Sequence, residues 1–167
     1  MDTFGWYQMS EVMFRHILDV LPVGKIVLEL GSGWGSSQLA KHYKTYSVEH
    51  DSNFLNKYDD VHYVFAPLNP RTGWYESDTM AENLPDHYDM IIVDGPSGGM
   101  VINGEKMKTS RVGFNRNIKL FNTDVPIFWD DTHFIPSYNA FMELALMLKK
   151  VPHLYAGDYT KSYGVLY

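Results

Sequence analysis

The chain has 167 residues, with 14 Lys and Arg against 20 Asp and Glu, so its formal net charge is −6. Hydrophobic residues make up 45% and charged residues 20% of the sequence, which supports a packed core and excludes a disordered chain. This length predicts one domain that covers residues 1–167. The acidic balance argues against nucleic acid as a partner, because such binding depends largely on neutralising phosphates.

The sequence contains no cysteine. Disulfide bonds, thiolate nucleophiles and cysteine-held zinc or iron–sulfur sites are therefore excluded. The first residues lack the basic start and apolar run of a signal peptide, and no apolar stretch reaches the roughly 20 residues that span a bilayer. We expect a cytoplasmic protein that does not bind membranes, and the sequence leaves a homo-oligomer open.

Apolar periodicity indicates helices and strands in alternation from the beginning of the chain. A helix capped by Ser10 is expected to stop before Pro22. Further elements follow in the order strand 25–30, helix 36–43, strand 45–49, helix 53–58 and strand 61–65. Residues 67–86 are mostly turn formers that leave room for a short helix.

The second half continues the alternation. The predicted elements are a strand at 88–93, a loop at 97–110, a helix at 111–121, a strand at 125–129, a helix at 136–150 and closing strands at 153–159 and 162–167. This order predicts a three-layer α/β/α fold, in which a Rossmann-like, doubly wound, seven-stranded and mostly parallel sheet ends in an antiparallel strand. Ligands of such sheets bind outside the carboxyl ends of the strands.

A glycine-rich segment, Glu29-Leu30-Gly31-Ser32-Gly33-Trp34-Gly35, follows the first strand and opens a helix. Alternate glycines let the backbone turn sharply and approach a ligand closely. The dinucleotide fingerprint has its third glycine one residue later, where this chain has Ser36, and the Gly-Lys-Ser/Thr of a phosphate-binding P-loop is absent. The match to a nicotinamide site is therefore imperfect.

Two carboxylates accompany this loop. Glu29 would repel a pyrophosphate and favours a ligand that carries a positive charge. Glu49 ends the second strand, where an acidic residue can accept both hydroxyls of a ribose.

Residues 27–35 and 46–51 resemble the first and second motifs of the class I S-adenosylmethionine-dependent methyltransferases. The resemblance covers nearly the whole chain, including the final antiparallel strand. It implies S-adenosylmethionine as the cofactor, with the glycines near its methionine and ribose portions, Glu29 orienting its amino end and Glu49 holding the ribose. The binding set implied in this way is Glu29, Gly31, Ser32, Gly33, Gly35, Glu49, His50, Ala66, Pro67 and Asp94.

A second likeness lies downstream, in the order of Ala66-Pro67-Leu68, Gly73-Trp74-Tyr75, Asp94-Gly95-Pro96, Arg111 and Asp130-Asp131-Thr132. It is similar to a branch of small methyltransferases in which several relatives act on sugars or small hydroxylated acceptors. The likeness implies O-methylation of such an acceptor. Trp74 and Tyr75 would stack on adenine or cover the site, and Arg111 would pair with an acidic acceptor group; core packing and an ordinary solvated arginine are the alternatives.

Asp94, Asp130 and Asp131 follow two strands that are adjacent in this fold, and three interpretations of them stay open. They resemble the acidic cluster that holds Mg²⁺ in catechol-type methyltransferases, although an Asp stands where an Asn is usual. Alternatively, His133 is a metal-free general base whose ring is oriented by an aspartate. In the third interpretation the acidic groups cap helices and bind the amino group of the cofactor. Catalytic candidates are Asp94, Asp131 and His133.

Some acceptors and functions are less well supported. The Asn/Asp-Pro-Pro-aromatic motif of base-amino methylation is replaced here by Asp94-Gly95-Pro96-Ser97, and cytosine carbon methylation needs a cysteine. Two alternatives remain: a noncatalytic protein that binds S-adenosylmethionine or another adenosyl ligand, and a nicotinamide-dependent reductase. Acceptor choice is expected to depend on residues 1–9, 67–86 and 97–110, or on a partner subunit.

Overall fold

The computed structural model describes residue 4 and residues 8–96, 100–102 and 104–167. Its helices are α1 (Glu11–Val20), α2 (Trp34–Ala40), α3 (Ser77–Asn83), α4 (Val112–Arg116) and α5 (Ile135–Leu148), with a 3-10 turn η1 at Ile118–Leu120. The main-sheet strands are β1 (Ile26–Leu30), β2 (Lys44–Glu49), β3 (Val61–Phe65), β6 (Met90–Val93), β9 (Ile127–Trp129), β10 (His153–Ala156) and β11 (Ser162–Leu166). Two small hairpins pair β4 (Leu68–Asn69) with β5 (Trp74–Tyr75), and β7 (Met100–Ile102) with β8 (Glu105–Met107).

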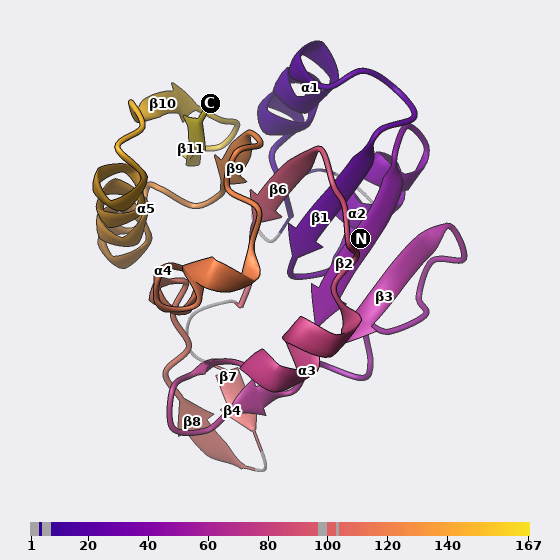
Figure 1. The fold of residues 1–167 in the computed structure, drawn as a ribbon, viewed down its shortest axis with the longest axis vertical. Helices are drawn as coiled ribbons and strands as arrows, with labels where there is room; N and C mark the ends of the chain where they lie inside the picture. The colour runs from indigo at the N-terminus through magenta and orange to yellow at the C-terminus, as the bar shows by residue number, and fades with distance from the viewer. Residues whose placement is uncertain (1–3, 5–7, 97–99, 103) are drawn as a thin grey trace.

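The seven-stranded sheet has the order β10-β11-β9-β6-β1-β2-β3 (Figure 1). Strands β3, β2, β1, β6 and β9 pair in parallel, whereas β11 is antiparallel to both of its neighbours. The order reverses between β1 and β6, which is the place where ligands bind in open α/β sheets. The predicted Rossmann-like architecture and its antiparallel last strand are confirmed.

The core lies in two layers, one on each face of the sheet, because side chains of a strand point to opposite faces in turn. Val27 packs with Met13 and Ile17 of α1 on one face. Its neighbour Leu28 packs on the other face, together with residues of α3, α4 and α5 such as Phe141. Both layers are apolar. The candidate functional side chains, which are polar, therefore lie at the carboxyl ends of the strands.

Several predicted elements are confirmed in place, and two are wrong. Ser10 caps α1, since its Oγ accepts a hydrogen bond from the backbone N–H of Met13 at 3.1 Å. Residues 53–58 form turns rather than a helix, because the side chain of Asp51 accepts the backbone N–H of Asn53 at 2.9 Å and Asn56 has a positive φ. The helix predicted at 111–121 is divided into α4 and η1 at Asn117.

The segments predicted as loops contain small elements of their own. Residues 67–86 contain the β4–β5 hairpin and α3, and residues 100–102 pair with residues 105–107 as the β7–β8 hairpin. In Figure 1, these hairpins lie with α3 and α4 beyond the carboxyl ends of β1 and β2. Parts of the segments 1–9 and 97–110, which were predicted to choose the acceptor, lie outside the described residues. No helix in the described ranges has the length and apolar character needed to cross a bilayer.

Candidate active site at the carboxyl ends of the strands

The loop after β1 touches the loop after β6. Gly31 has φ +96°, a left-handed conformation that favours glycine, and a Cβ built on it would lie 2.8 Å from the backbone nitrogen of Gly95. A Cβ on Gly95 would in turn lie 2.7 Å from Cα of Gly31 and 2.5 Å from the hydroxyl of Tyr75. The two loops therefore meet backbone to backbone, with no room for a side chain between them.

Glu49 anchors the glycine loop from the end of β2. Its carboxylate accepts backbone N–H groups of Ser32 at 2.9 Å, His50 at 2.7 Å and Asp51 at 2.8 Å, and the residue is 4% exposed. Burial alone would raise its pKa, but the hydrogen bonds from the His50 side chain and from the Asp51 and Ser32 amides lower it below the ordinary value. Glu49 is therefore ionised, and its oxygens already accept hydrogen bonds from the glycine loop and from the residues that follow β2. The predicted contact with a ribose would have to use the same oxygens.

Glu29 lies beneath the same loop, with 2% of its surface exposed. Its carboxyl group accepts the hydroxyls of Ser36 at 2.5 Å and Ser47 at 3.0 Å. Burial raises the pKa of Glu29 to about 8, assisted by the charges of Asp94 and Glu49 and partly offset by the two serines. At neutral pH the side chain is largely protonated, so a role in attracting a cationic ligand would require its ionisation on binding.

The N-terminal segment lies over the glycine loop. Gln8 accepts the backbone N–H of Trp34 through Oε1 at 2.9 Å, and a Cβ on Gly33 would lie 2.8 Å from the same oxygen. A Cβ built on Gly35 would likewise lie 3.3 Å from the Cβ of Met9. Glycine at positions 33 and 35 therefore lets the chain from Gln8 to Met9 pack closely on the loop.

The predicted aspartates come together at the ends of β6 and β9. Asp94, Asp130 and Asp131 each offer a carboxylate oxygen within 4.8 Å of the others. Their side chains differ in exposure, at 28% for Asp94, 1% for Asp130 and 20% for Asp131. Asp94 is thus the carboxylate most accessible to a bound molecule.

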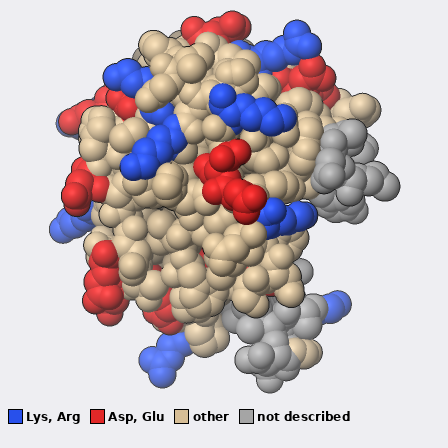
Figure 2. All heavy atoms as spheres, turned by 90° about the vertical axis from the view of Figure 1, so that its right-hand side faces the viewer, with Lys and Arg blue, Asp and Glu red and all other residues tan. Residues whose placement is uncertain are grey.

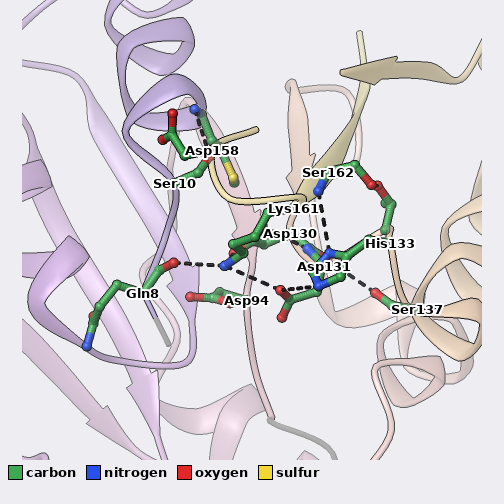
Figure 3. Close-up of polar contacts among 12 residues, drawn as sticks. Gln8, Ser10, Asp94, Asp130, Asp131, His133, Ser137, Asp158, Lys161 and Ser162 are labelled. Carbon is green, nitrogen blue, oxygen red and sulfur yellow. Dashed lines mark hydrogen bonds and ion pairs between the residues drawn. The ribbon is translucent and has the colours of Figure 1, made fainter. Parts of the chain in front are cut away.

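Two buried cations pair with this cluster of three carboxylates. Arg111 donates from Nη2 to Asp131 at 2.7 Å and to Asp94 at 3.2 Å, and it also contacts the backbone carbonyls of Asp94 and Asp130. Lys161 donates from Nζ to Asp130 at 3.0 Å and lies 3.3 Å from Asp131. Figure 3 shows the Lys161 ammonium between these aspartates and the backbone oxygen of Gln8, which it contacts at 2.8 Å.

The three carboxylates have different protonation equilibria. Burial raises the pKa of Asp94 to about 7, with a further increase from the charge of Asp130, and Arg111 opposes the change. Burial also raises the pKa of Asp130, and the negative charge of the neighbouring Asp131 raises it further. For Asp131, the cations Arg111 and Lys161 outweigh burial and lower the pKa. Asp94 therefore combines accessibility with a proton equilibrium near neutrality.

Solved structures with a similar fold were found, although no protein-family model and no curated protein matches the chain. A Streptococcus mutans protein assigned as a methyltransferase and solved with SAH has a TM-score of 0.60 at 11% identity, over 93% of this chain and 95% of that chain. The chain has the class I methyltransferase fold.

Two further structures show the range of proteins that share this methyltransferase fold. A Staphylococcus aureus protein assigned as a caffeoyl-CoA O-methyltransferase has a TM-score of 0.57 at 12% identity, over 93% of this chain and 81% of that chain. The B. subtilis tRNA methyltransferase TrmK has a TM-score of 0.59 at 10% identity, over 96% and 66% of the two chains. Such different acceptors on one fold mean that the acceptor must be argued from the site itself.

The aspartate cluster of this methyltransferase fold does not fit a divalent metal ion. Magnesium needs carboxylate oxygens that are free to coordinate it. Here Arg111 and Lys161 already contact all three aspartates, so a metal ion would have to displace buried cations that are themselves paired. The predicted Mg²⁺ set of Asp94, Asp130 and Asp131 is close in space but is arranged as an ion-pair network.

His133 lies beside the cluster with its ring already oriented. Its Nδ1 accepts the backbone N–H of Ser162 at 3.4 Å, and its Nε2 lies 4.0 Å from Oδ1 of Asp131. In the neutral ring this arrangement places the proton on Nε2, facing a carboxylate. The geometry therefore leaves no unprotonated nitrogen directed at an acceptor, and it disfavours His133 as the general base.

The predicted substrate residues have mainly structural positions. Trp74 and Tyr75 are each 1% exposed and belong to the core, which is the alternative that the sequence left open. Arg111 is 8% exposed and binds the aspartates of the protein itself rather than a solvated partner. Ala66 donates its backbone N–H to the carbonyl of Glu49 at 2.9 Å, which places it and Pro67 beside the end of β2.

Sequence reasoning missed Lys161 and Gln8. Lys161 lies in the turn between β10 and β11, where a lysine is ordinarily solvated, yet it is only 5% exposed. Its partners Asp130 and Gln8 are 31 and 153 positions away along the chain. No local pattern could have indicated these contacts, because they arise only when β11 packs beside β9.

Proposed function

We propose that the protein is an S-adenosylmethionine-dependent methyltransferase that methylates an oxygen of a small hydroxylated or saccharide acceptor. The observation that carries the proposal is the position of Asp94, a partly exposed carboxyl group with a pKa of about 7, directly beside the contact between the glycine loop at Gly31 and the loop at Gly95. The glycine loop and a carboxyl group that titrates near neutrality thus both lie where the strand order reverses, which supports the proposal.

The residues around the glycine loop would hold the cofactor in the following way. Gly31 and Ser32 follow β1 and would approach the methionine portion, whereas Gly33 and Gly35 contact Gln8 and Met9. Glu49 and His50 lie at the end of β2 and would face the ribose and the adenosine edge. Bound there, S-adenosylmethionine supplies an electrophilic methyl group on a sulfonium. Glu29, which is largely protonated beneath the loop, would have to ionise to attract the amino group of the cofactor.

Asp94 is the residue that we assign to proton transfer. It accepts the proton of the acceptor hydroxyl while the oxygen–carbon bond forms and the sulfur–carbon bond breaks. General bases act best when their pKa lies near the working pH, as that of Asp94 does. Arg111 holds the carboxylate of Asp94 through Oδ1 and keeps it in place during the step. Asp131, which stays ionised, positions Arg111 from the other side.

The acceptor class is argued from charge as well as from the site. The chain carries a net charge of −6, and on the face shown in Figure 2 the Lys and Arg side chains are interspersed with Asp and Glu. An extended basic surface, which phosphate binding requires, is not present on that face. The net negative charge of the chain therefore favours a small acceptor over a nucleic acid.

Calorimetry with the purified protein tests the cofactor. We expect S-adenosylhomocysteine to bind and NAD not to bind, and the opposite result would replace the proposal with a nicotinamide-dependent enzyme. The variant Gly31→Ala should lose the binding, because its Cβ would lie 2.8 Å from Gly95. Gly24→Ala is a matched control, since Gly24 has a similar φ of +86° with nothing within 4 Å of its Cβ. Binding without any methyl transfer would favour a noncatalytic role.

A further inference from the structure

Helix α5 carries apolar side chains on the side that faces solvent as well as on the side that faces the core. Its buried residues are Ala140, Phe141, Leu144 and Ala145. A second apolar stripe runs along the helix at spacings of three and four positions, through Ile135, Tyr138, Met142 and Leu146. The two ends of this stripe are open to solvent, since Ile135 is 74% and Leu146 is 79% exposed.

The composition of α5 is that of a helix covered on all sides. Of its 14 residues, only Glu143 carries a charge. A helix on the surface of a protein ordinarily shows charged and polar side chains on its solvent side, and a helix that is apolar all round is normally buried. We therefore expect the solvent side of α5 to be covered by another molecule.

The apolar surface continues beyond the helix. Leu154 of β10 lies directly opposite Gly164 of β11, so the two positions share one face of the sheet. A Cβ on Gly164 would lie 2.4 Å from the ring of Phe141, which places Leu154 beside α5. Figure 1 shows α5 and β10 on the same side of the molecule, at the end of the sheet opposite β3.

Exposed apolar side chains are concentrated in this region. Of the 13 large apolar side chains that are exposed in the described ranges, seven belong to residues 134–154. Single exposed apolar residues are normal, whereas a cluster of them marks an interaction surface. We call the exposed apolar side chains of residues 134–154, together with Met142, the α5 surface.

Electrostatics limit what can cover the α5 surface. The chain has a net charge of −6, so two copies repel each other except where they meet through a surface with few charges. The α5 surface meets this condition. Helices that lie on membranes carry Lys and Arg on their polar side, and α5 contains neither. A second copy of the chain is therefore favoured over a lipid surface.

The size of the α5 surface also suits a dimer. A standard interface buries about 800 Å² per partner, of which roughly 65% is apolar in homodimers, so about 500 Å² of apolar surface is needed. Full burial of one aliphatic or aromatic side chain removes on the order of 100 Å² from water. Seven side chains that are exposed by 38% to 79% thus supply most of this requirement.

We propose that the α5 surface is the interface of a homodimer, in which the α5 helices of two copies pack antiparallel about a two-fold axis. Two-fold symmetry is the commonest in homo-oligomers and makes every contact reciprocal. With the axis level with Ala140, Ile135 packs on Leu146 of the second copy, and Tyr138 packs on Met142 of the second copy. Each of these contacts joins two apolar side chains.

This dimer places the second copy beside the candidate active site. The backbone N–H of Phe134 donates to the carbonyl of Asp131 at 3.1 Å, so α5 begins next to the aspartate cluster. Leu146 of the second copy, which packs on Ile135, therefore lies at this end of the helix.

Molar mass in solution tests the proposal. The wild type is measured by size exclusion with light scattering and by analytical ultracentrifugation, at about 1 to 100 µM, the range in which an interface of this size would dissociate. We expect twice the chain mass of 19.3 kDa. Ile135→Glu and Leu146→Lys should each weaken the dimer more than about 100-fold, because each substitution buries two unpaired charges.

Two controls separate a lost interface from a lost fold. Both substituted side chains are exposed in the single copy, so the circular dichroism spectra of the variants should match that of the wild type. Val23→Glu, in the turn before β1, replaces an apolar side chain that is 71% exposed and should leave the dimer intact.

A mixing experiment tests the antiparallel register. When Ile135→Glu and Leu146→Lys are combined, the introduced Glu of one copy meets the introduced Lys of the other, while Ile135 and Leu146 remain in contact at the second site. The mixture should therefore form a dimer that contains one copy of each variant, although neither variant forms a dimer alone.

The proposal is overturned by a wild type that keeps the chain mass up to the highest concentration, or by variants that form dimers as the wild type does. A mixture that stays monomeric would reject the antiparallel register. If a monomeric wild type instead sedimented with phosphatidylcholine vesicles and Ile135→Glu did not, the α5 surface would be assigned to a lipid surface.

Discussion

The two sides of the candidate active site stabilise buried carboxylates in opposite ways. On the side of the glycine loop, Glu29 and Glu49 are held by serine hydroxyls and backbone N–H groups that lie at most 18 positions away. On the other side, the aspartates are held by the side chains of Arg111 and Lys161, across 17 to 31 positions, and Lys161 also reaches Gln8 across 153.

The difference shows what each side can do. On the first side, burial outweighs the two serine hydroxyls, so Glu29 keeps its proton at neutral pH, whereas the hydrogen bonds to Glu49 keep that residue ionised. Paired cations keep Asp131 ionised and leave Asp94, the most exposed member, to titrate near neutrality. We infer that the first side is a binding platform and that the second side does the proton chemistry.

The largest expected effect comes from removing the titrating group of the second side. Asp94→Asn keeps the hydrogen bond from Arg111 but cannot accept a proton, so turnover should fall by about 10²- to 10⁴-fold. The turnover of the wild type should rise with pH through about 7, as Asp94 ionises. A methyl-transfer assay with saturating cofactor measures both. If the Asp94→Asn variant instead kept the turnover of the wild type but bound the cofactor more weakly, Asp94 would be assigned to binding the cofactor's amino group.

The next effect tests whether the ion network of the second side is needed for folding. Lys161→Met leaves Asp130 buried without its cation, which should cost about 3–5 kcal/mol of unfolding free energy. The melting temperature should fall by about 10 °C, as followed by calorimetry or circular dichroism. Lys119→Met, at an exposed lysine, is the control. Adding Asp130→Asn to Lys161→Met should restore part of the loss; absence of any rescue would contradict the charge-pairing argument.

A smaller effect concerns Glu29 on the first side. Its pKa is raised from 4.5 to about 8 in the folded protein, so the folded state holds a proton that the unfolded state has released. The stabilisation is complete below pH 4.5 and is lost as the pH rises to about 8. The melting temperature of the wild type should therefore decrease over this interval by several degrees more than that of Glu29→Gln. His16 and Asp94 titrate in both proteins, and parallel curves would contradict the assignment.

The smallest expected effect is that of metal removal. Because Arg111 and Lys161 occupy the aspartates, a chelator should leave methyl transfer and melting temperature unchanged. A loss of activity that Mg²⁺ restores would show that a metal ion displaces one of the two cations. Measuring the reaction before and after dialysis against a chelator decides between these outcomes.

Much of the fold could be predicted because its signals are local. Ser10 and the apolar spacing after it indicate α1, and the buried strand that ends at Gly31 indicates β1. The short segments were harder to predict. The turn at Asp51 competes with a helix through a single side-chain hydrogen bond, and Asn117 divides α4 from η1. Whether these short segments form a turn or a helix depends on small differences in free energy, which hydrophobic periodicity does not reveal.

The sequence by itself determined the order of the elements, the glycine loop after β1 and the placement of acidic groups after β2, β6 and β9. These features follow from residue type and spacing within a few tens of positions. Only the tertiary structure decided what the acidic groups contact. It turned a possible metal site into an ion network, buried Trp74 and Tyr75, and brought Lys161 to Asp130 and Gln8. The physical reason is that the pKa and the partners of a buried charge depend on neighbours brought near it by folding, not on neighbours along the chain.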